Sequence, residues 1–190
     1  RKQKYDFYKE GRQATPDDLI KQMPIARKIL TAMGIKYLEL EPYEADDIIG
    51  TLARMAEVDP EYVATIISSD RDLLQLLSDE VDIKLLKQTG YVRYNPESFK
   101  ADYGIDPIKI IDLKALAGDS SDNIPGVKGI GEKTALKLLQ EYGSLEGIYD
   151  HIDLIKGKTK EKLETDRDNA FMSKDIATIY KDVPLNISFD

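Results

Sequence analysis

The chain has 190 residues, of which 42% are hydrophobic and 33% are charged, with no cysteine and a single histidine. It is long enough to form a globular core, and its composition excludes disulfides, thiolate zinc sites, cysteine nucleophiles and histidine metal clusters. The net charge of -8 does not by itself indicate a nucleic-acid partner. No apolar run approaches the length of a membrane span and the basic start is unlike a signal peptide, so we expect a cytoplasmic protein without a membrane partner.

The first twelve residues form a basic strip with aromatic residues inside it. Its members are Arg1, Lys2, Lys4, Tyr5, Phe7, Tyr8, Lys9 and Arg12. Thr15 then offers a helix N-cap with Pro16 at the first helical position, and apolar residues recur over 19–33. The pattern predicts a helix that Gly34 ends and that Pro24 kinks.

Strand and helix patterns alternate in the next part of the chain. Residues 35–40 are predicted as a strand, 43–57 as a helix and 63–69 as a buried strand rich in β-branched residues. A short helix follows over 73–77.

Two further strand patterns, over 81–86 and 91–94, predict a hairpin across Gln88, Thr89 and Gly90, and everything from Pro96 onward is predicted to be helical. We therefore expect an α/β lobe over residues 1–117, whose first segment is residues 1–12, and a helical lobe over 118–190.

Seven acidic residues stand in three short clusters, and these carry the main functional signal. They are Glu44, Asp46 and Asp47 in YEADD, Asp70 and Asp72 in SDRD, and Asp119 and Asp122 in GDSSDN. Carboxylates brought together by folding repel one another unless cations lie among them or their protonation shifts. The clusters together predict a magnesium-dependent site for phosphate chemistry.

Each cluster also has a structural interpretation. Acids in the first turn of a helix interact favourably with the helix dipole, which accounts for one or two acids of YEADD about as well as a metal does. Asp70 is placed to cap the helix that follows it, which leaves Asp72 unexplained, and both follow a strand end where ligands gather in α/β sheets. Aspartate is a common turn residue, so the segment with Asp119 and Asp122, taken by itself, is better explained as a turn than as a metal site. The metal hypothesis depends on the three clusters together.

A glycine-rich segment, IPGVKGIGEKTALKLL, begins at Ile124. Gly129 and Gly131 permit a tight turn that presents backbone N–H groups to a phosphate at the start of a helix, with Lys128, Lys133 and Lys137 around it. This pattern is typical of a helix-hairpin-helix, which grips the DNA backbone without reading bases. A dinucleotide-binding turn requires a preceding strand and a third glycine, and the segment has neither.

The motifs YKEGR, YEADD, SDRD, GDSSDN and PGVKGIGEKTA occur in this order along nearly the whole chain. In this respect the chain resembles the 5′-nuclease family of flap endonucleases and 5′→3′ exonucleases, to which the nuclease domain of bacterial DNA polymerase I belongs. The resemblance implies a PIN-like α/β core that holds two divalent metal ions, a helical arch over the site, and a helical lobe whose helix-hairpin-helix binds duplex DNA.

The resemblance also implies residue roles. The metal ligands would be Glu44, Asp46, Asp47, Asp70, Asp72, Asp119 and Asp122. Lys9 and Arg12 would contact the phosphate near the scissile bond as catalytic residues. The DNA contacts would come from Lys128, Gly129, Gly131, Lys133 and Thr134 in the hairpin and from Tyr8 in the arch, although an apolar arch face accounts for Tyr8 equally well.

The implied activity is two-metal hydrolysis of DNA phosphodiesters at 5′ ends and flaps, in primer removal and repair. Two Mg²⁺ ions are the expected cofactors, with Mn²⁺ as a substitute. Branched or 5′-ended duplex DNA is the expected partner of a monomeric protein. The alternatives are a duplex-binding module with an idle acidic site, and a ribonuclease of the wider PIN group, which leaves GVKGIGEKTA without a role.

The chain departs from the family at its beginning. The family pattern places two further aspartates ahead of the position that aligns with Arg1, so we expect the chain to begin roughly 70 residues into the family domain. In this interpretation the chain lacks two carboxylates of the site, which leaves inactivity of the chain on its own as an alternative. The parent protein either carries a polymerase domain after Asp190 or is a free-standing exonuclease.

Overall fold

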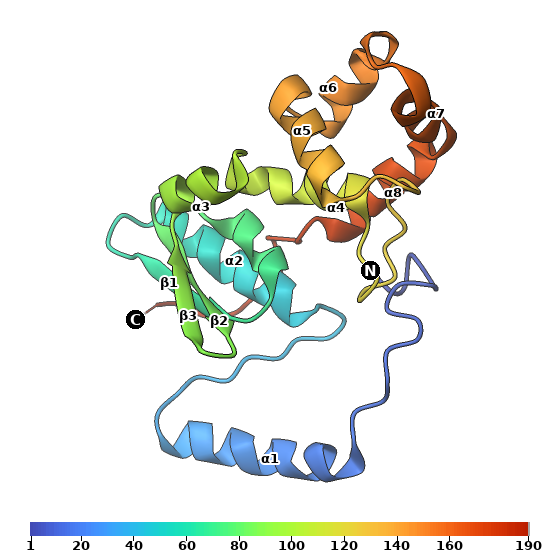
Figure 1. The fold of residues 1–190 in the computed structure, drawn as a ribbon. Coiled ribbons are helices and arrows are strands. Elements are labelled where there is room, and N and C mark those ends of the chain that lie inside the picture. Colours follow the sequence, from blue (N-terminus) through green and yellow to red (C-terminus); the bar gives the residue numbers. More distant parts are fainter. Residues whose placement is uncertain (190) are drawn as a thin grey trace.

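The computed structural model describes residues 1–189 and has two lobes, a small α/β lobe and a helical lobe (Figure 1). The α-helices are α1 (Asp17–Ala32), α2 (Ala45–Val58), α3 (Pro96–Tyr103), α4 (Ile110–Ala117), α5 (Glu132–Tyr142), α6 (Leu145–Asp150), α7 (Gly157–Thr165) and α8 (Arg167–Ala177). The strands are β1 (Ala64–Ser68), β2 (Val81–Lys87) and β3 (Gly90–Tyr94). Three 3₁₀ turns complete the set, η1 (Arg71–Leu76), η2 (Pro107–Lys109) and η3 (Ile152–Leu154).

The three strands form one sheet in the order β1-β2-β3. β1 runs parallel to β2, with Ile66 opposite Ile83, and β2 forms the predicted antiparallel hairpin with β3. α2 packs against β1 and β2, so the face of the sheet that carries Ile83 and Leu85 is buried. The alternation of strand and helix predicted for this lobe is confirmed.

β1 differs from its prediction as a strand buried on both sides. Ile66 is buried, but the side chains of Val63 and Ile67 are 83% and 63% exposed. Successive side chains of a strand point to opposite faces of the sheet, and in the described residues the face that carries Val63 and Ile67 is left exposed.

Residues 35–40 are irregular, so the strand predicted there is wrong. A strand needs a hydrogen-bonding partner, and none of the three strands among the described residues pairs with this segment. The helix before it is present as α1, with Pro16 rather than Thr15 at the N-cap, and it continues through Pro24.

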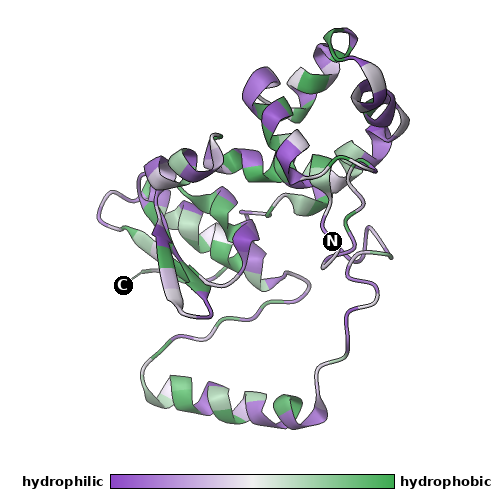
Figure 2. Cartoon of the chain, viewed as in Figure 1, coloured by the Kyte–Doolittle hydropathy of each residue, from purple (hydrophilic) through white to green (hydrophobic). Residues whose placement is uncertain are grey.

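α1 stands apart from both lobes and buries none of its residues (Figure 1). It nevertheless carries several hydrophobic side chains, as Figure 2 shows, among them Ile20, Ile25 and Ile29.

The helical lobe is built from α4 to α8. α4 packs against α5 and α8, and the fully buried side chains of Leu116, Leu145, Ile148 and Leu163 fill the space between the helices. The prediction of helix from Pro96 onward is confirmed for α3 to α8, but residues 118–131 form a structured loop and 178–189 are irregular. The expected lobe boundary at 117 falls at the end of α4 and would place this helix in the α/β lobe. α4 packs against η1 and η2 as well as against α5 and α8, and the boundary stays a prediction. No helix among the described residues is long and apolar enough to cross a membrane.

Candidate active site

Four of the predicted metal ligands line one open cavity of about 700 Å³. The charged residues of its lining are Arg12, Asp70, Arg71, Asp72, Lys114, Asp119, Asp122 and Glu132. The turn after β1 supplies one pair of aspartates and the turn after α4 supplies the other pair. The fold therefore brings together two of the three acidic clusters.

Lys114, on α4, lies between two of these aspartates. Its ammonium forms a 2.5 Å ion pair with Asp119 and a second ion pair with Asp72. Burial alone would lower the pKa of Lys114, but the two carboxylates outweigh this effect and raise it. Burial likewise opposes ionisation of Asp119, yet hydrogen bonds from Lys114 and Ser121 lower the pKa of Asp119 to about 2. The ion pair of Lys114 with Asp119 is therefore fully charged at neutral pH.

The other two aspartates of the cavity differ in exposure. Asp70 is exposed and accepts a 2.9 Å hydrogen bond from the N–H of Asp72, so it does cap η1 as the structural interpretation predicted. Asp122 is only 8% exposed and pairs with the guanidinium of Arg12. Neither contact excludes a second role, because each carboxylate has further lone pairs.

The first acidic cluster lies beside this cavity and not in its lining. Asp47 is 6% exposed and accepts hydrogen bonds from the N–H groups of Glu44 and Tyr180, at 3.1 and 3.0 Å. Arg1 forms a 2.9 Å ion pair with the same carboxylate. Asp47 therefore joins α2 to both ends of the chain, which is a structural role.

Asp46 connects the first cluster to the second. Burial raises the pKa of Asp46 to about 6, and the charge of Asp70 adds to this rise. Asp46 therefore interacts electrostatically with the second cluster, although it does not line the cavity.

Lys9 and Arg12, the predicted catalytic residues, contact acids of two different clusters. Lys9 forms an ion pair with Glu44, and Arg12 with Asp122. The main chain is fixed at the same place, because the N–H of Lys9 donates a 3.0 Å hydrogen bond to the carbonyl of Asp122. The two predicted catalytic cations therefore lie beside the first and third acidic clusters, and their contact with DNA stays a prediction.

Tyr8 lies below these two residues and is 3% exposed. Its ring packs against Ile124 and Ile176, and its hydroxyl lies 3.3 Å from Glu44 and 3.5 Å from Asp122. Burial raises the pKa of Tyr8 to about 12, so the hydroxyl stays protonated. The DNA contact expected of Tyr8 stays a prediction, and in this structure the ring faces the core.

The suitability of the acids for a metal ion depends on how many converge at one point. Within residues 1–189, no three acidic or histidine side chains lie close enough together to hold a metal ion. Asp72 and Asp119, however, converge on a single cationic nitrogen, that of Lys114. Mg²⁺ keeps several waters and is commonly bound by only one or two carboxylates. This pair of oxygen ligands therefore fits a hard divalent cation.

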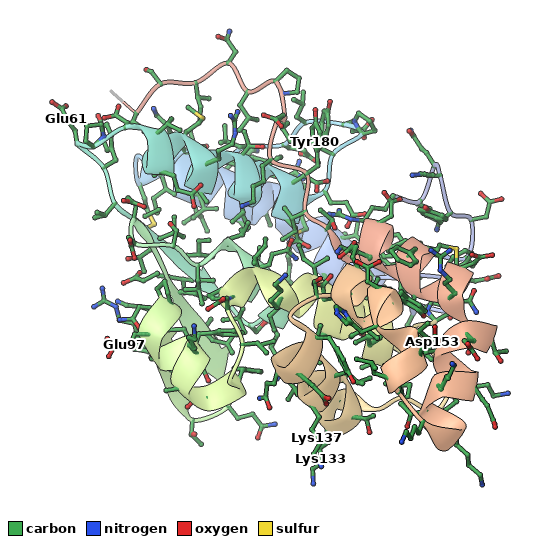
Figure 3. The ribbon with its side chains drawn as sticks, turned by 90° about the horizontal axis from the view of Figure 1, so that it is seen from above. Glu61, Glu97, Lys133, Lys137, Asp153 and Tyr180 are labelled. Atoms are coloured by element: carbon green, nitrogen blue, oxygen red, sulfur yellow. The ribbon has the colours of Figure 1, made fainter. Side chains whose placement is uncertain are left out.

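The predicted hairpin lies between α4 and α5. Gly129 has a φ of 79°, which favours glycine, and Gly131 is the N-cap of α5 in an extended conformation. The cations around it are exposed, and Figure 3 shows Lys133 and Lys137 projecting from the same side of α5, away from the protein. Thr134 follows in the first turn of α5 and is half-buried. A helix N-terminus with lysines beside it is suited to bind phosphate.

Two cations of the site were not predicted as functional from the sequence. Arg1 contacts Asp47 and Glu44, and Lys114 contacts Asp72 and Asp119. No local pattern links either cation to its distant partner. The one usable signal was that Lys114 precedes Asp119 by little more than one helical turn.

Family models that together match the whole chain define its class as that of the 5′-3′ exonucleases. The N-terminal resolvase-like domain of the 5′-3′ exonuclease matches residues 1–104, and the C-terminal SAM fold of the same family matches residues 105–190. The chain therefore belongs to the 5′-3′ exonuclease family, and the expected PIN-like core with a helical C-terminal lobe is confirmed.

The chain is similar to one part of DNA polymerase I from Bacillus subtilis (strain 168), with 50% identity over 184 residues, which is 95% of this chain. It is also similar to DNA polymerase I of Bacillus caldotenax, with 49% identity over the whole chain. The chain spans only 21% and 22% of the length of these two relatives. A structure of the T5 5′-exonuclease with bound zinc ions has a TM-score of 0.74 and 25% identity, covering 94% of this chain and 69% of the T5 chain.

Proposed function

We propose that this chain is the nuclease part of a structure-specific 5′ nuclease, which hydrolyses DNA phosphodiesters at 5′ ends and flaps in cytoplasmic primer removal and repair. The observation that carries the proposal is the cavity in which Asp70, Asp72, Asp119 and Asp122 meet the cationic Arg12. Membership of the 5′-3′ exonuclease family and the metal-bound T5 structure support it.

The proposed cofactors are two Mg²⁺ ions, which Mn²⁺ can replace. When bound, divalent cations generate a nucleophile from water at neutral pH and stabilise the charge on the leaving oxygen. The aspartates of the cavity would hold them, together with the acids of YEADD, of which Asp46 is the best placed because it interacts with Asp70. Hard oxygen ligands favour Mg²⁺ and Mn²⁺ over softer metals.

The remaining residues of the site would bind and orient the DNA. Lys9 and Arg12 would neutralise charge on the phosphate at the scissile bond, a role that requires no proton transfer. Gly129, Gly131 and the lysines around them would hold the backbone of the duplex. A DNA-binding role for an acidic chain is consistent with this division, because four of the predicted metal ligands gather at one cavity while the lysines of α5 face outward.

Cleavage of a 5′-flap duplex in Mg²⁺ tests the proposal, with the chain carrying the N-terminal segment that the family pattern predicts. We expect Asp70→Asn combined with Asp72→Asn to abolish cleavage. The matched control is Asp79→Asn, an exposed aspartate outside the cavity lining, which should cleave normally. Cleavage that persists in the double variant, or that needs no divalent metal, would rule the proposal out.

A second function, duplex binding without catalysis, is favoured for the isolated chain by one observation. Its carboxylates are paired with its own cations, and no three of them converge within the described residues. Duplex binding in EDTA tests it. Gly131→Asp should weaken binding, and Gly131→Asn is the control because both are good N-cap residues and a Cβ at this position meets no atom within 4 Å. Equal affinity of the two variants would argue against the hairpin as the DNA contact.

A further inference from the structure

Lys114 occupies the point at which Asp72 and Asp119 converge. Its side chain is 17% exposed, and those of Asp72 and Asp119 are 15% and 21% exposed, so water screens this group of charges only partly. The lysine reaches the cavity from α4, whereas one aspartate lies in η1 and the other follows α4. The ion pair of Lys114 with Asp72 therefore depends on the tertiary fold.

The oxygens that Lys114 contacts are the ones that a metal ion would need. The Oδ1 atom of Asp119 accepts hydrogen bonds from the N–H and the hydroxyl of Ser121, at 2.8 and 2.6 Å. Its Oδ2 atom faces Lys114. The turn thus orients the carboxylate of Asp119, so that Oδ1 accepts the hydrogen bonds of the turn and Oδ2 is directed toward a cation. An ammonium and a divalent ion cannot occupy that position together.

We propose that Lys114 is a built-in competitor for the divalent cation, which has to displace the ammonium from Asp72 and Asp119 in order to bind. The inference rests on the proposed function, because it concerns the same carboxylates. It assigns to Lys114 the role of a positioning residue that holds the carboxylates of Asp72 and Asp119 toward one point before the metal arrives. It also sets the metal concentration at which the site fills.

The competing explanation is that Lys114 only ties η1 to the end of α4. The two explanations predict opposite effects on metal affinity. Removal of a competitor tightens metal binding, because the same two carboxylates lose their cation and keep their positions through Ser121 and η1. Removal of a structural tie loosens the carboxylates and weakens metal binding or leaves it unchanged.

The experiment is a titration of the 190-residue chain with Mn²⁺, in which electron paramagnetic resonance measures the free ion. Lys114→Met should lower the Kd for Mn²⁺ about tenfold, whereas Lys114→Arg, which keeps the charge, should stay close to the unmodified chain. The matched control is Lys160→Gln. It also removes one positive charge from an ion pair, that of Lys160 on α7 with Asp153 on η3, and it should leave the Kd for Mn²⁺ unchanged. Thermal unfolding in EDTA checks that each variant is folded.

A measurement on the unmodified chain serves if Lys114→Met does not fold. Acetylation of each lysine by an amine-reactive reagent is followed by mass spectrometry, with and without Mn²⁺. Displacement by the metal should increase the reactivity of Lys114, and the reactivity of Lys160 should not change. Protection of Lys114 by Mn²⁺, or no change, would overturn the inference.

The outcomes separate this inference from the proposed function. Mn²⁺ binding that is lost in Asp72→Asn but is unaffected or weakened by Lys114→Met would overturn the role of Lys114 and leave the metal site standing. If the unmodified chain and Lys114→Met both bind no Mn²⁺ in the millimolar range, then the metal site itself fails, and the role of Lys114 fails with it.

Discussion

The ammonium of Lys162 donates a 2.8 Å hydrogen bond to the main-chain carbonyl of Gly129. This contact joins α7 to the hairpin between α4 and α5, and it packs tightly, because a Cβ on Gly129 would lie 2.9 Å from the same nitrogen. The shape of the hairpin is thus fixed by a helix that follows it in the sequence.

Gly129→Ala should lower the free energy of unfolding by about 1–2 kcal/mol, because alanine has to adopt a left-handed conformation and displace Lys162. Urea unfolding measures the change. Gly131→Ser is the matched control: Gly131 has an ordinary φ of -93° and serine is a good N-cap, so this variant should be at least as stable as the unmodified chain. Equal destabilisation by both variants would contradict the role assigned to the φ of Gly129.

Lys133 and Lys137 should contribute to duplex affinity through the DNA backbone. Replacing both lysines by glutamine should weaken binding to duplexes of any sequence. The slope of log K for DNA binding against log salt concentration should become less steep by about 2. A control at Lys84, which lies on β2, should leave the slope unchanged. Fluorescence anisotropy over a range of salt concentrations measures both, and an unaltered slope in the double variant would show that α5 does not face the DNA.

Neighbouring aspartates at the start of α2 should have opposite effects on stability. Asp47 is buried and accepts hydrogen bonds from Glu44 and Tyr180 as well as an ion pair from Arg1. Asp47→Asn should therefore lower the free energy of unfolding by about 1–3 kcal/mol, because an amide replaces the charged acceptor. Urea unfolding at pH 7 in EDTA tests this expectation, and an unchanged midpoint would contradict the structural role of Asp47.

Asp46→Asn should instead stabilise the metal-free chain at pH 7. Burial raises the folded-state pKa of Asp46 to about 6, above its ordinary value of 3.8. The folded chain therefore binds more protons than the unfolded chain between these values, and stability falls as the pH rises through this window. The variant should be more stable at pH 7 by about 1 to 2 kcal/mol once solvent screening is allowed for, and should show a flatter pH profile over 4–6. A profile identical to that of the unmodified chain would contradict the raised pKa.

Lys9 should affect catalysis more than binding. Lys9→Met removes the ammonium that pairs with Glu44 and leaves the hairpin intact. We expect the flap-cleavage rate constant to fall about 10²-fold, with a much smaller change in flap affinity, because the cation acts on charge that develops at the phosphate. Single-turnover cleavage with saturating enzyme separates the two quantities. If Lys9→Met weakens the affinity for the flap and leaves the cleavage rate constant unchanged, then Lys9 binds DNA and does not contribute to catalysis.

Local patterns predicted those parts of the fold whose partners are near in sequence. The β2–β3 hairpin was predicted from alternation and turn residues, and α2 from its helical pattern, and each is stabilised by contacts within its own segment. The strand expected over 35–40 failed because alternation of hydrophobic residues does not supply a pairing partner. The exposure of Ile67 was not predictable either, because a run of β-branched residues does not show which face of the sheet other elements cover.

The acids of the candidate site were predictable because their clusters repeat along the chain, but their counter-ions were not. Asp72 and Lys114 meet only after η1 packs against α4, and Arg1 reaches Asp47 only after the first residues fold against α8. A sequence pattern also cannot distinguish a carboxylate that holds the fold, such as Asp47, from one that faces a cavity, such as Asp72, because the difference lies in burial and hydrogen bonds.

The carboxylates of the cavity should bind divalent metal ions at a nuclease site. Anomalous X-ray diffraction from crystals of the chain grown with Mn²⁺ and a 5′-flap duplex tests this binding. We expect anomalous density between Asp72 and Asp119, with the ammonium of Lys114 moved away from it. Ordered DNA on the hairpin without any Mn²⁺ at these aspartates, at saturating metal, would contradict this expectation.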